Sequence, residues 1–167
     1  MKFDSVHITE KFEHFKHVLK QSGIRCTPQR IEIFRKVLQS EDHPDAVSIY
    51  EDIRKNVPSV SLDTVYRNLW LFIDLGLITT LGQRRDRLRF DRNVDSHHHF
   101  YCTQCGIALD FDSDEFNALQ IPDNYQNIGA VVSSHVELRG VCSVCLKDDT
   151  QAEQNKKTHD KEENDEG

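Results

Sequence analysis

The sequence predicts an α+β fold, with an N-terminal winged helix-turn-helix domain followed by a C-terminal α/β domain built around paired cysteines. Segments with helical spacing of apolar residues precede two short strand-like segments, and the second half alternates apolar and polar residues around two Cys-x-x-Cys pairs. The net charge also differs between the two halves. Residues 1–90 carry 15 basic and 12 acidic side chains, whereas residues 91–167 carry 6 and 16. The mildly basic first half suits a polyanion, and the acidic second half suits cations.

Capping residues and helix breakers define the elements of the first half. Gly23 stops the first helix, and Thr27 with Pro28 provides an N-cap and a proline at the first helical position of the second. Ser61 caps the fourth helix. The expected helices are at about 10–22, 28–39, 45–55 and 61–75, and the expected strands are at 77–82 and 87–91, joined by a polar turn at 83–86. Helices followed by such a hairpin place one helix in the major groove of DNA.

The second half is expected to hold strands within residues 97–111 and 125–138 and a short helix at 114–119. Residues 148–167 contain almost no apolar side chains and are expected to form a disordered acidic tail. The expected domains are a DNA-binding domain at 1–90 and a dimerisation and metal-binding domain at 91–147.

The sequence also excludes some classes of protein. It has no run of 18 apolar residues, so no membrane span and no membrane partner are expected. The charged start lacks the apolar region of a secretory signal, so a cytoplasmic location is expected.

Four of the five cysteines form two pairs, Cys102 with Cys105 and Cys142 with Cys145, separated by 36 residues. Two such pairs complete a tetrahedral four-sulfur site for one structural Zn2+. Disulfides are unfavourable in the cytosol, no βαβ context supports a redox motif, and iron in the same site has no supporting feature. Cys26 is expected to be simply packed.

A run of histidines, His97, His98 and His99, precedes the first pair. Residues i and i+2 of a strand share a face, so His97 and His99 can bind one metal while His98 points away. Asp91 and Asp110 are candidate oxygen ligands, and this donor set suits Fe(II), Mn(II) or Zn(II). The alternative is a solvated polar strand.

Several motifs now match a known family. The segment from Ser61 to Leu69, the turn from Thr27 to Arg30, the histidine-rich strand and the paired cysteines together resemble ferric uptake regulator (Fur) proteins over about residues 10–147. The resemblance implies a homodimer of α+β chains, with winged-helix domains on a palindromic operator in double-stranded DNA and C-terminal α/β dimerisation domains. It implies metal-dependent repression of transcription.

Within the family, the chain resembles most the peroxide-stress regulator branch. The resemblance implies one structural Zn2+ and one regulatory Fe2+ or Mn2+ per subunit. The implied ligands of the regulatory metal are His43, Asp91, His97, His99 and Asp110. Asp91 carries weight, because iron- and zinc-sensing relatives usually have glutamate at that place.

A further metal site of many family members falls here on Ser96, His98, Asn117 and Ser134. Only His98 can ligate, so this site is expected to be absent. His135 lies one position from Ser134, and a shift of one residue turns a strand side chain to the other face.

The fourth helix is the expected recognition helix. The expected DNA-binding residues are Arg25 before the second helix, the cap Ser61, and Thr64, Tyr66 and Arg67. The alternative is a core helix with a few exposed polar residues. Arg84, Arg85, Arg87 and Arg89 are expected to contact phosphates from the wing, and a solvated turn is the alternative.

The expected mechanism is a change of geometry between domains. His43 lies in the first half, and His97, His99 and Asp110 lie in the second, so a shared metal fixes the spacing of two recognition helices. The resemblance implies that hydrogen peroxide, the only expected small-molecule substrate, reacts with an Fe(II)-loaded site and oxidises His43 or His97, which releases metal and DNA.

Two alternatives remain open. One is an iron, manganese or zinc homeostasis repressor of the same family. The other is a zinc hydrolase or deaminase, and the sequence disfavours any enzyme, because a deaminase needs His-x-Glu before its Pro-Cys-x-x-Cys and a four-sulfur site leaves no position for water. His135-Val-Glu137 lies between the cysteine pairs, in the wrong order.

Overall fold

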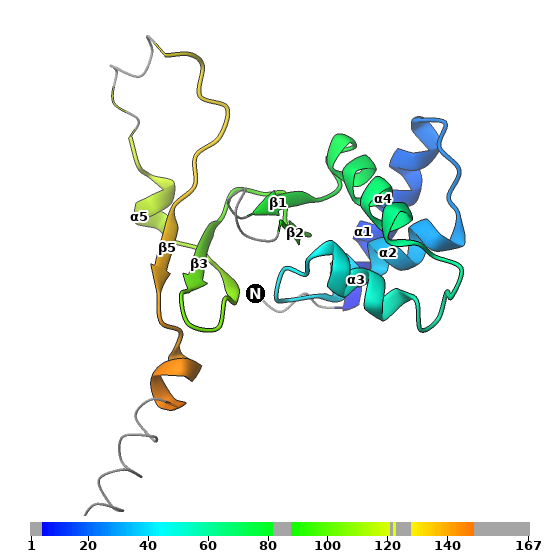
Figure 1. Cartoon of the computed structure of the whole chain (residues 1–167). Helices are drawn as coiled ribbons and strands as arrows, with labels where there is room; N and C mark the ends of the chain where they lie inside the picture. Colours follow the sequence, from blue (N-terminus) through cyan, green and yellow to red (C-terminus); the bar gives the residue numbers. More distant parts are fainter. Residues whose placement is uncertain (1–4, 82–87, 121, 123–127, 149–167) are drawn as a thin grey trace, which may run out of the picture. The chain divides into compact units, whose positions relative to one another are not determined.

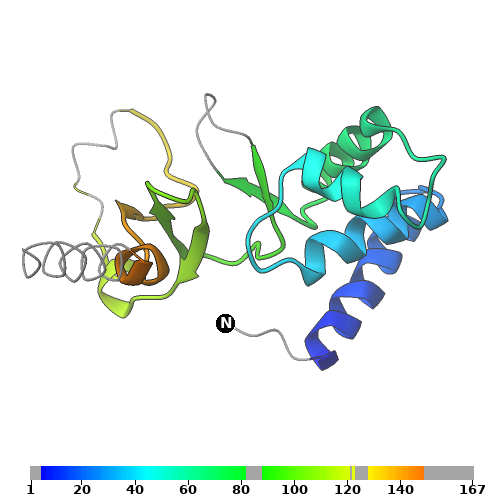
Figure 2. The same ribbon diagram turned by 60° about the horizontal axis from the view of Figure 1, so that its bottom comes forward.

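Four helices and a two-stranded hairpin form the first of two structural units. The computed structural model describes residues 5–81, 88–120, 122 and 128–148, and its contacts divide the chain into Met1–Asp95 and Ser96–Gly167. The helices of the first unit pack together beside the hairpin, as Figures 1 and 2 show. Its elements are α1 (Ser5–Gln21), α2 (Pro28–Gln39), α3 (Ala46–Ile53), α4 (Leu62–Asp74), β1 (Thr79–Leu81) and β2 (Arg89–Asp91).

Three phenylalanine rings from three helices form the centre of this unit. The rings of Phe15 and Phe34 are stacked with centroids 4.2 Å apart, and Phe72 meets both edge-on at 5.5 Å. All three side chains are buried. Such contacts add to the hydrophobic effect and fix α1, α2 and α4 against one another.

The predicted helix starts are confirmed where a cap was identified. Thr27 accepts a hydrogen bond from the Arg30 N–H with Pro28 at the first helical position, and Ser61 accepts one from the Thr64 N–H. The first helix begins at Ser5, earlier than predicted, because its apolar face extends to Ile8, which packs against the core. Local capping therefore locates α2 and α4 well.

The hairpin begins later than predicted because the preceding residues close α4. Gly76, with a φ of 66°, donates to the Ile73 carbonyl, and Leu77 donates to the Phe72 carbonyl at 2.9 Å. This is a glycine-dependent helix stop, so Leu77 and the buried Ile78 are not in the strand. The strands then pair antiparallel from Thr79 opposite Asp91 to Leu81 opposite Arg89. The predicted turn at 83–86 lies outside the described residues.

A three-stranded sheet with the order β4-β3-β5 forms the second unit. Its elements are β3 (His98–Cys102), β4 (Ala108–Phe111), the short helix α5 (Asp114–Asn117) and β5 (Glu137–Gly140) (Figure 1). The central strand β3 pairs antiparallel with β4 and parallel with β5. Residues 143–148 are helical, which the sequence analysis did not predict.

The predicted strand at 125–138 is wrong for most of its length. Residues 130–136 are irregular, and β5 begins only at Glu137, opposite His99. Because β3 itself begins at His98, the residues before Glu137 meet no strand to pair with in the part of the chain that is described. The apolar residues of this segment alternate as in a strand, but the described part of the chain provides no neighbouring strand for it to pair with.

None of the described helices is long and apolar enough to cross a membrane. Most of the predicted tail, residues 149–167, lies outside the described residues, and Asp148 is the last described residue of the helical stretch that begins at Ser143, within the second cysteine pair.

Candidate metal centres

The four paired cysteines converge on one point in the second unit. Their Sγ atoms all lie within 4.8 Å of one another. Cys102 Sγ is 3.9 Å from Cys145 Sγ, and Cys105 Sγ is 3.8 Å from Cys142 Sγ. Thiolates about 2.3 Å from a tetrahedral zinc are about 3.8 Å from one another. The cluster therefore fits a structural zinc ion.

The turn after β3 prepares one sulfur to carry negative charge. Cys102 Sγ accepts hydrogen bonds from the Cys105 N–H at 3.5 Å and from the Cys142 N–H at 3.3 Å. These donors lower the pKa of the Cys102 thiol to about 6. The adjacent Cys142 thiol and burial raise the pKa of Cys145. Without a cation the four thiols do not ionise together, whereas a bound zinc stabilises all four as thiolates.

Cys26 does not belong to this cluster and is exposed, so the expectation that it is packed is wrong. It follows Gly23 in the turn between α1 and α2, where the chain runs along the surface.

In the first unit, a buried histidine and a buried aspartate face each other. His43 Nε2 is 3.5 Å from Asp91 Oδ1, and the two residues are 4% and 0% exposed. Asp91 is the last residue of β2, and the same Oδ1 accepts the Asn93 N–H at 2.8 Å. Ionisable side chains are rarely fully buried in a hydrophobic core, and a buried carboxylate beside a buried imidazole is typical of metal or catalytic sites.

In the second unit, two histidines share one carboxylate oxygen. His97 Nε2 and His99 Nε2 each lie 3.5 Å from Asp110 Oδ1. Asp110 is the partner of His99 across the β3–β4 pair, which explains why the carboxylate reaches the histidines. The centroids of the His97 and His99 rings are 4.4 Å apart, so the predicted common face is confirmed.

His98 lies on the other face, as predicted. Its ring is 5.4 Å from that of Phe111 and 5.6 Å from that of Phe116, and its Nδ1 accepts the Val136 N–H at 3.2 Å. Its Nε2 is buried without a hydrogen-bond partner, but Ser96, Asn117 and Ser134 are exposed and offer no imidazole, thiolate or carboxylate beside it. These residues do not fit a further metal site.

His135 is a neighbour that the sequence analysis did not assign to the histidine cluster. Its exposed ring lies 6.3 Å from the ring of His99. Because His135 lies in the irregular segment 130–136, strand alternation gave no signal for its place near His99.

The expected DNA-contacting residues of α4 lie at its capped end. Ser61 Oγ and Thr64 Oγ1 are 2.8 Å apart, and Tyr66 is 38% exposed. Arg67 Nε pairs with Asp63 at 3.0 Å, and both side chains are well exposed. Trp70, one turn beyond Tyr66 and 49% exposed, is a surface residue that the sequence analysis missed. Arg25 is also exposed.

Arg89 is placed differently from the prediction that put it in a phosphate-contacting wing. Its Nη1 donates to the backbone carbonyls of Asp42 and His43, each at 3.1 Å. The reason is that β2 runs beside the His43 loop, where Arg89 and Asp45 form a bridge. Arg84, Arg85 and Arg87 lie outside the described residues.

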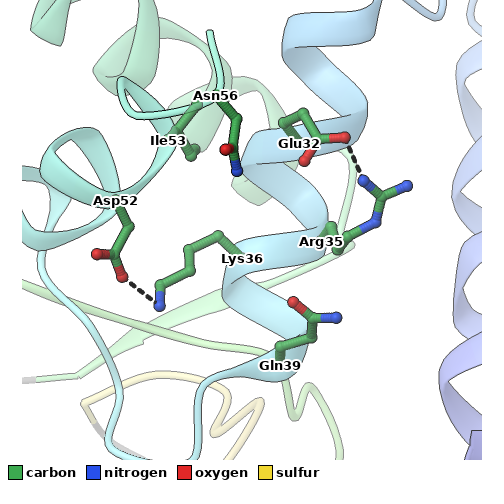
Figure 3. A pocket seen from close by; sticks show the side chains of 7 residues that line it. All are labelled: Glu32, Arg35, Lys36, Gln39, Asp52, Ile53 and Asn56. Carbon is green, nitrogen blue, oxygen red and sulfur yellow. Dashed lines mark hydrogen bonds and ion pairs between the residues drawn. The ribbon is translucent and has the colours of Figure 1, made fainter.

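A polar groove of about 250 Å³ lies between α2 and α3, and Figure 3 shows the residues that line it. Its charged groups neutralise one another, because Lys36 pairs with Asp52 and Arg35 pairs with Glu32. Hydrogen bonds from Lys36 and Lys55 lower the pKa of Asp52 to about 2. The charged side chains that line the groove therefore balance one another.

Comparisons with known proteins agree with this architecture. A model described as the ferric uptake regulator family matches residues 21–138. The peroxide-responsive repressor PerR of Staphylococcus aureus is 36% identical over 127 residues, which are 76% of this chain and 86% of that protein.

Solved structures give the same result. A zinc-bound manganese uptake regulator is 33% identical, with a TM-score of 0.61 over 76% of this chain and 97% of its own. The Helicobacter pylori ferric uptake regulator Fur, 22% identical, shares the fold with a TM-score of 0.67 over 83% of this chain and 93% of its own. This chain therefore belongs to the ferric uptake regulator family, whose members are metal-dependent regulators of transcription.

Proposed function

We propose that this protein is a metal-dependent, DNA-binding repressor that senses hydrogen peroxide. In this proposal, residues 1–90 bind DNA, residues 91–147 dimerise and hold metal, and the homodimer recognises a palindromic operator. The observation that carries the proposal is that each structural unit holds its own histidine–carboxylate set, separate from the cysteines.

The four cysteines are proposed to hold one structural Zn2+ per subunit. Their sulfur spacing supports this, and so does their position, because three of them are buried at the centre of the second unit. A four-sulfur site is saturated by the protein and leaves no place for a substrate. The zinc is therefore proposed to stabilise the fold and not to sense.

The regulatory metal is proposed to bind His43 and Asp91 from the first unit and His97, His99 and Asp110 from the second. Three imidazoles and two carboxylates suit Fe2+ or Mn2+ better than a thiolate set does. Each set is already drawn together within its own unit, with nitrogen–oxygen distances of 3.5 Å. A metal that takes ligands from both units would fix their relative geometry and so the spacing of two recognition helices.

Peroxide sensing is proposed to act through the ligands themselves. Bound Fe(II) would give the first electron to the O–O bond of peroxide and regain one from the imidazole, so the imidazole provides both electrons in the net change. In the net change, one peroxide oxygen enters a ring C–H bond of His43 or His97, and the other leaves as water. The oxidised imidazole is a poorer ligand, so metal and then DNA are released. The aspartates at 91 and 110 and the similarity to a peroxide-responsive repressor support this reading.

DNA binding is proposed to use α4 in the major groove. Thr64, Tyr66 and Arg67 lie on its first two turns, where recognition helices contact base edges. Arg67 can reach guanine or phosphate once its exposed pair with Asp63 opens, because exposed ion pairs are weak. Ser61 and Arg25 are proposed to contact the DNA backbone.

The peroxide step is tested by mass spectrometry on the protein loaded anaerobically with Fe(II). After one equivalent of peroxide, we expect a gain of one oxygen atom on His43 or His97 and loss of operator binding. The Mn(II)-loaded protein is the control and should remain unmodified. If both histidines stay unmodified and operator binding persists, peroxide sensing is excluded.

A second candidate is an iron, manganese or zinc homeostasis repressor without peroxide sensing. The similarity to a zinc-bound manganese uptake regulator favours it. Operator affinity titrated with each metal, with and without peroxide, distinguishes the two functions.

A further inference from the structure

We propose that Arg89 is a positioning residue for the regulatory metal: it holds the backbone of His43 in the one conformation that presents this imidazole to Asp91. The proposal rests on the proposed function, in which His43 and Asp91 are metal ligands. It assigns to Arg89 a role inside the protein in place of a contact with DNA.

The starting point is an unusual backbone at His43. Among the described residues it is the only one other than glycine with a positive φ, at 50°. A side chain with a Cβ is disfavoured in this left-handed region, because Cβ approaches the following carbonyl oxygen. His43 is nevertheless 4% exposed, so its conformation is held by its surroundings.

Arg89 supplies a large part of that restraint. Its Nη1 donates to the carbonyls of Asp42 and His43, both at 3.1 Å, and so fixes the peptide on each side of the His43 Cα. Fixing both peptides fixes the direction of the Cα–Cβ bond. The side chain then has only its own rotamers left to choose, and its Nε2 lies 3.5 Å from Asp91 Oδ1.

The backbone of β2 completes the clamp. The Phe90 N–H donates to the Pro44 carbonyl at 3.0 Å, and Asp45 forms an antiparallel bridge with Arg89. Asp45 in turn caps α3 by accepting the Ser48 N–H at 2.7 Å. The loop is therefore tied to β2 on one side and to α3 on the other.

The same short strand places both proposed ligands. Arg89 and Asp91 are two residues apart on β2, so they share a side of the strand. Any movement of β2 that shifts Asp91 also moves the clamp on His43. We infer that the pair is preorganised as one unit, which lowers the conformational cost of binding metal.

The size of the effect follows from the restraint that is lost. Without Arg89 the loop can relax to ordinary backbone conformations, and only a fraction of molecules presents His43. Apparent metal affinity falls by that fraction, and the usual left-handed penalty corresponds to roughly tenfold. Saturating metal should restore the competent form.

The experiment measures Mn(II) affinity of the zinc-loaded, full-length protein by titration calorimetry, for wild type, Arg89→Gln, His43→Ala and the double variant. We expect Arg89→Gln to weaken Mn(II) binding about tenfold, and to have no added effect in the His43→Ala background. Arg89→Lys, which retains one donor group, should lie between. Arg35→Gln is the control, because Arg35 pairs with Glu32 on α2, away from the His43 loop.

Operator binding at saturating Mn(II) separates this role from contact with phosphate. The probe is the duplex selected from random DNA by the Mn(II)-loaded wild-type protein. We expect Arg89→Gln to regain wild-type operator affinity at saturating metal. Weaker operator binding at every metal concentration with unchanged Mn(II) affinity would assign Arg89 to the DNA interface and overturn the proposal.

The remaining outcomes are also decisive. An equal loss of Mn(II) affinity from Arg89→Gln with and without His43 would mean that Arg89 does not act through His43, and unchanged affinity would mean that it has no role. If His43→Ala alone binds Mn(II) like wild type, the proposed ligand set fails instead. Thermal unfolding of each variant checks that a loss of Mn(II) affinity is not a loss of folding. If Arg89→Gln does not fold, Arg89→Lys takes its place.

Discussion

Replacing Cys142 by serine removes one of four sulfur donors from the centre of the second unit. The described part of this unit has four buried hydrophobic residues, and three of them are cysteines. The partly buried side chains packed against those cysteines are Phe100, Ile107 and Val141. The unit therefore has little apolar core apart from the cluster itself.

The magnitudes favour unfolding of the second unit alone. Full burial of a side chain such as valine or phenylalanine contributes about 1.5–3 kcal/mol, so three partly buried ones contribute a few kcal/mol in total. Structural zinc in small domains contributes about 10–16 kcal/mol, as much as the whole stability of an ordinary domain. The first unit has its own core, centred on Phe15, Phe34 and Phe72, and should remain folded.

The assay combines zinc content with hydrogen exchange. For Cys142→Ser we expect loss of zinc, fast exchange of the amides of β3 and β5, and unchanged protection in α2 and α4. Cys26→Ser is the matched control, because Cys26 is an exposed free cysteine in the first unit. A Cys142→Ser protein that keeps one zinc per chain and a protected, dimeric second unit would refute the structural role of the cluster.

Three further predictions concern other parts of the chain. His97→Ala should remain zinc-loaded and folded but lose Mn(II)-dependent operator binding; a variant that still responds to Mn(II) would remove His97 from the ligand set. Ser61→Ala should lower the free energy of unfolding in urea by about 1 kcal/mol through loss of the helix cap, and no change would show that the cap does not contribute. Asp52→Asn should be less stable than wild type at pH 7. The lowered pKa of Asp52 means that its stabilisation is present above its ordinary pKa near 3.8 and is lost as the pH falls through about 2. Because the carboxylate is 41% exposed, the difference should be below about 1 kcal/mol; a difference in urea unfolding that is undiminished at pH 2 would contradict this cause.

Local signals in the sequence were sufficient for the four helices of the first unit and for the cysteine cluster, but not for the helix at 143–148. A cap such as Ser61 acts on the next three residues, so its effect can be predicted without knowing the rest of the fold. The two Cys-x-x-Cys pairs bring four soft ligands together by chemistry, whatever the 36 residues between them do. The alternation at His97 and His99 likewise placed both rings on one face.

The features that the sequence did not reveal depend on contacts between distant segments. The strand predicted at 125–138 needed a partner, and β3 is too short to provide one before Glu137. Arg89 looked like part of a basic wing, but the pairing of β2 with the His43 loop turns its guanidinium to two carbonyls. The positive φ of His43 could not be predicted from the sequence, because only a few per cent of non-glycine residues adopt it and contacts with distant segments select which ones do.

The central claim is that a metal ion held by the histidines and aspartates controls binding to DNA. The most direct measurement is the affinity of the zinc-loaded protein for its selected duplex without regulatory metal, with Mn(II), and with Fe(II) before and after peroxide. We expect tight binding with either metal, weak binding without metal, and loss of binding after peroxide in the Fe(II) form alone. Equal affinity with and without regulatory metal would contradict the account.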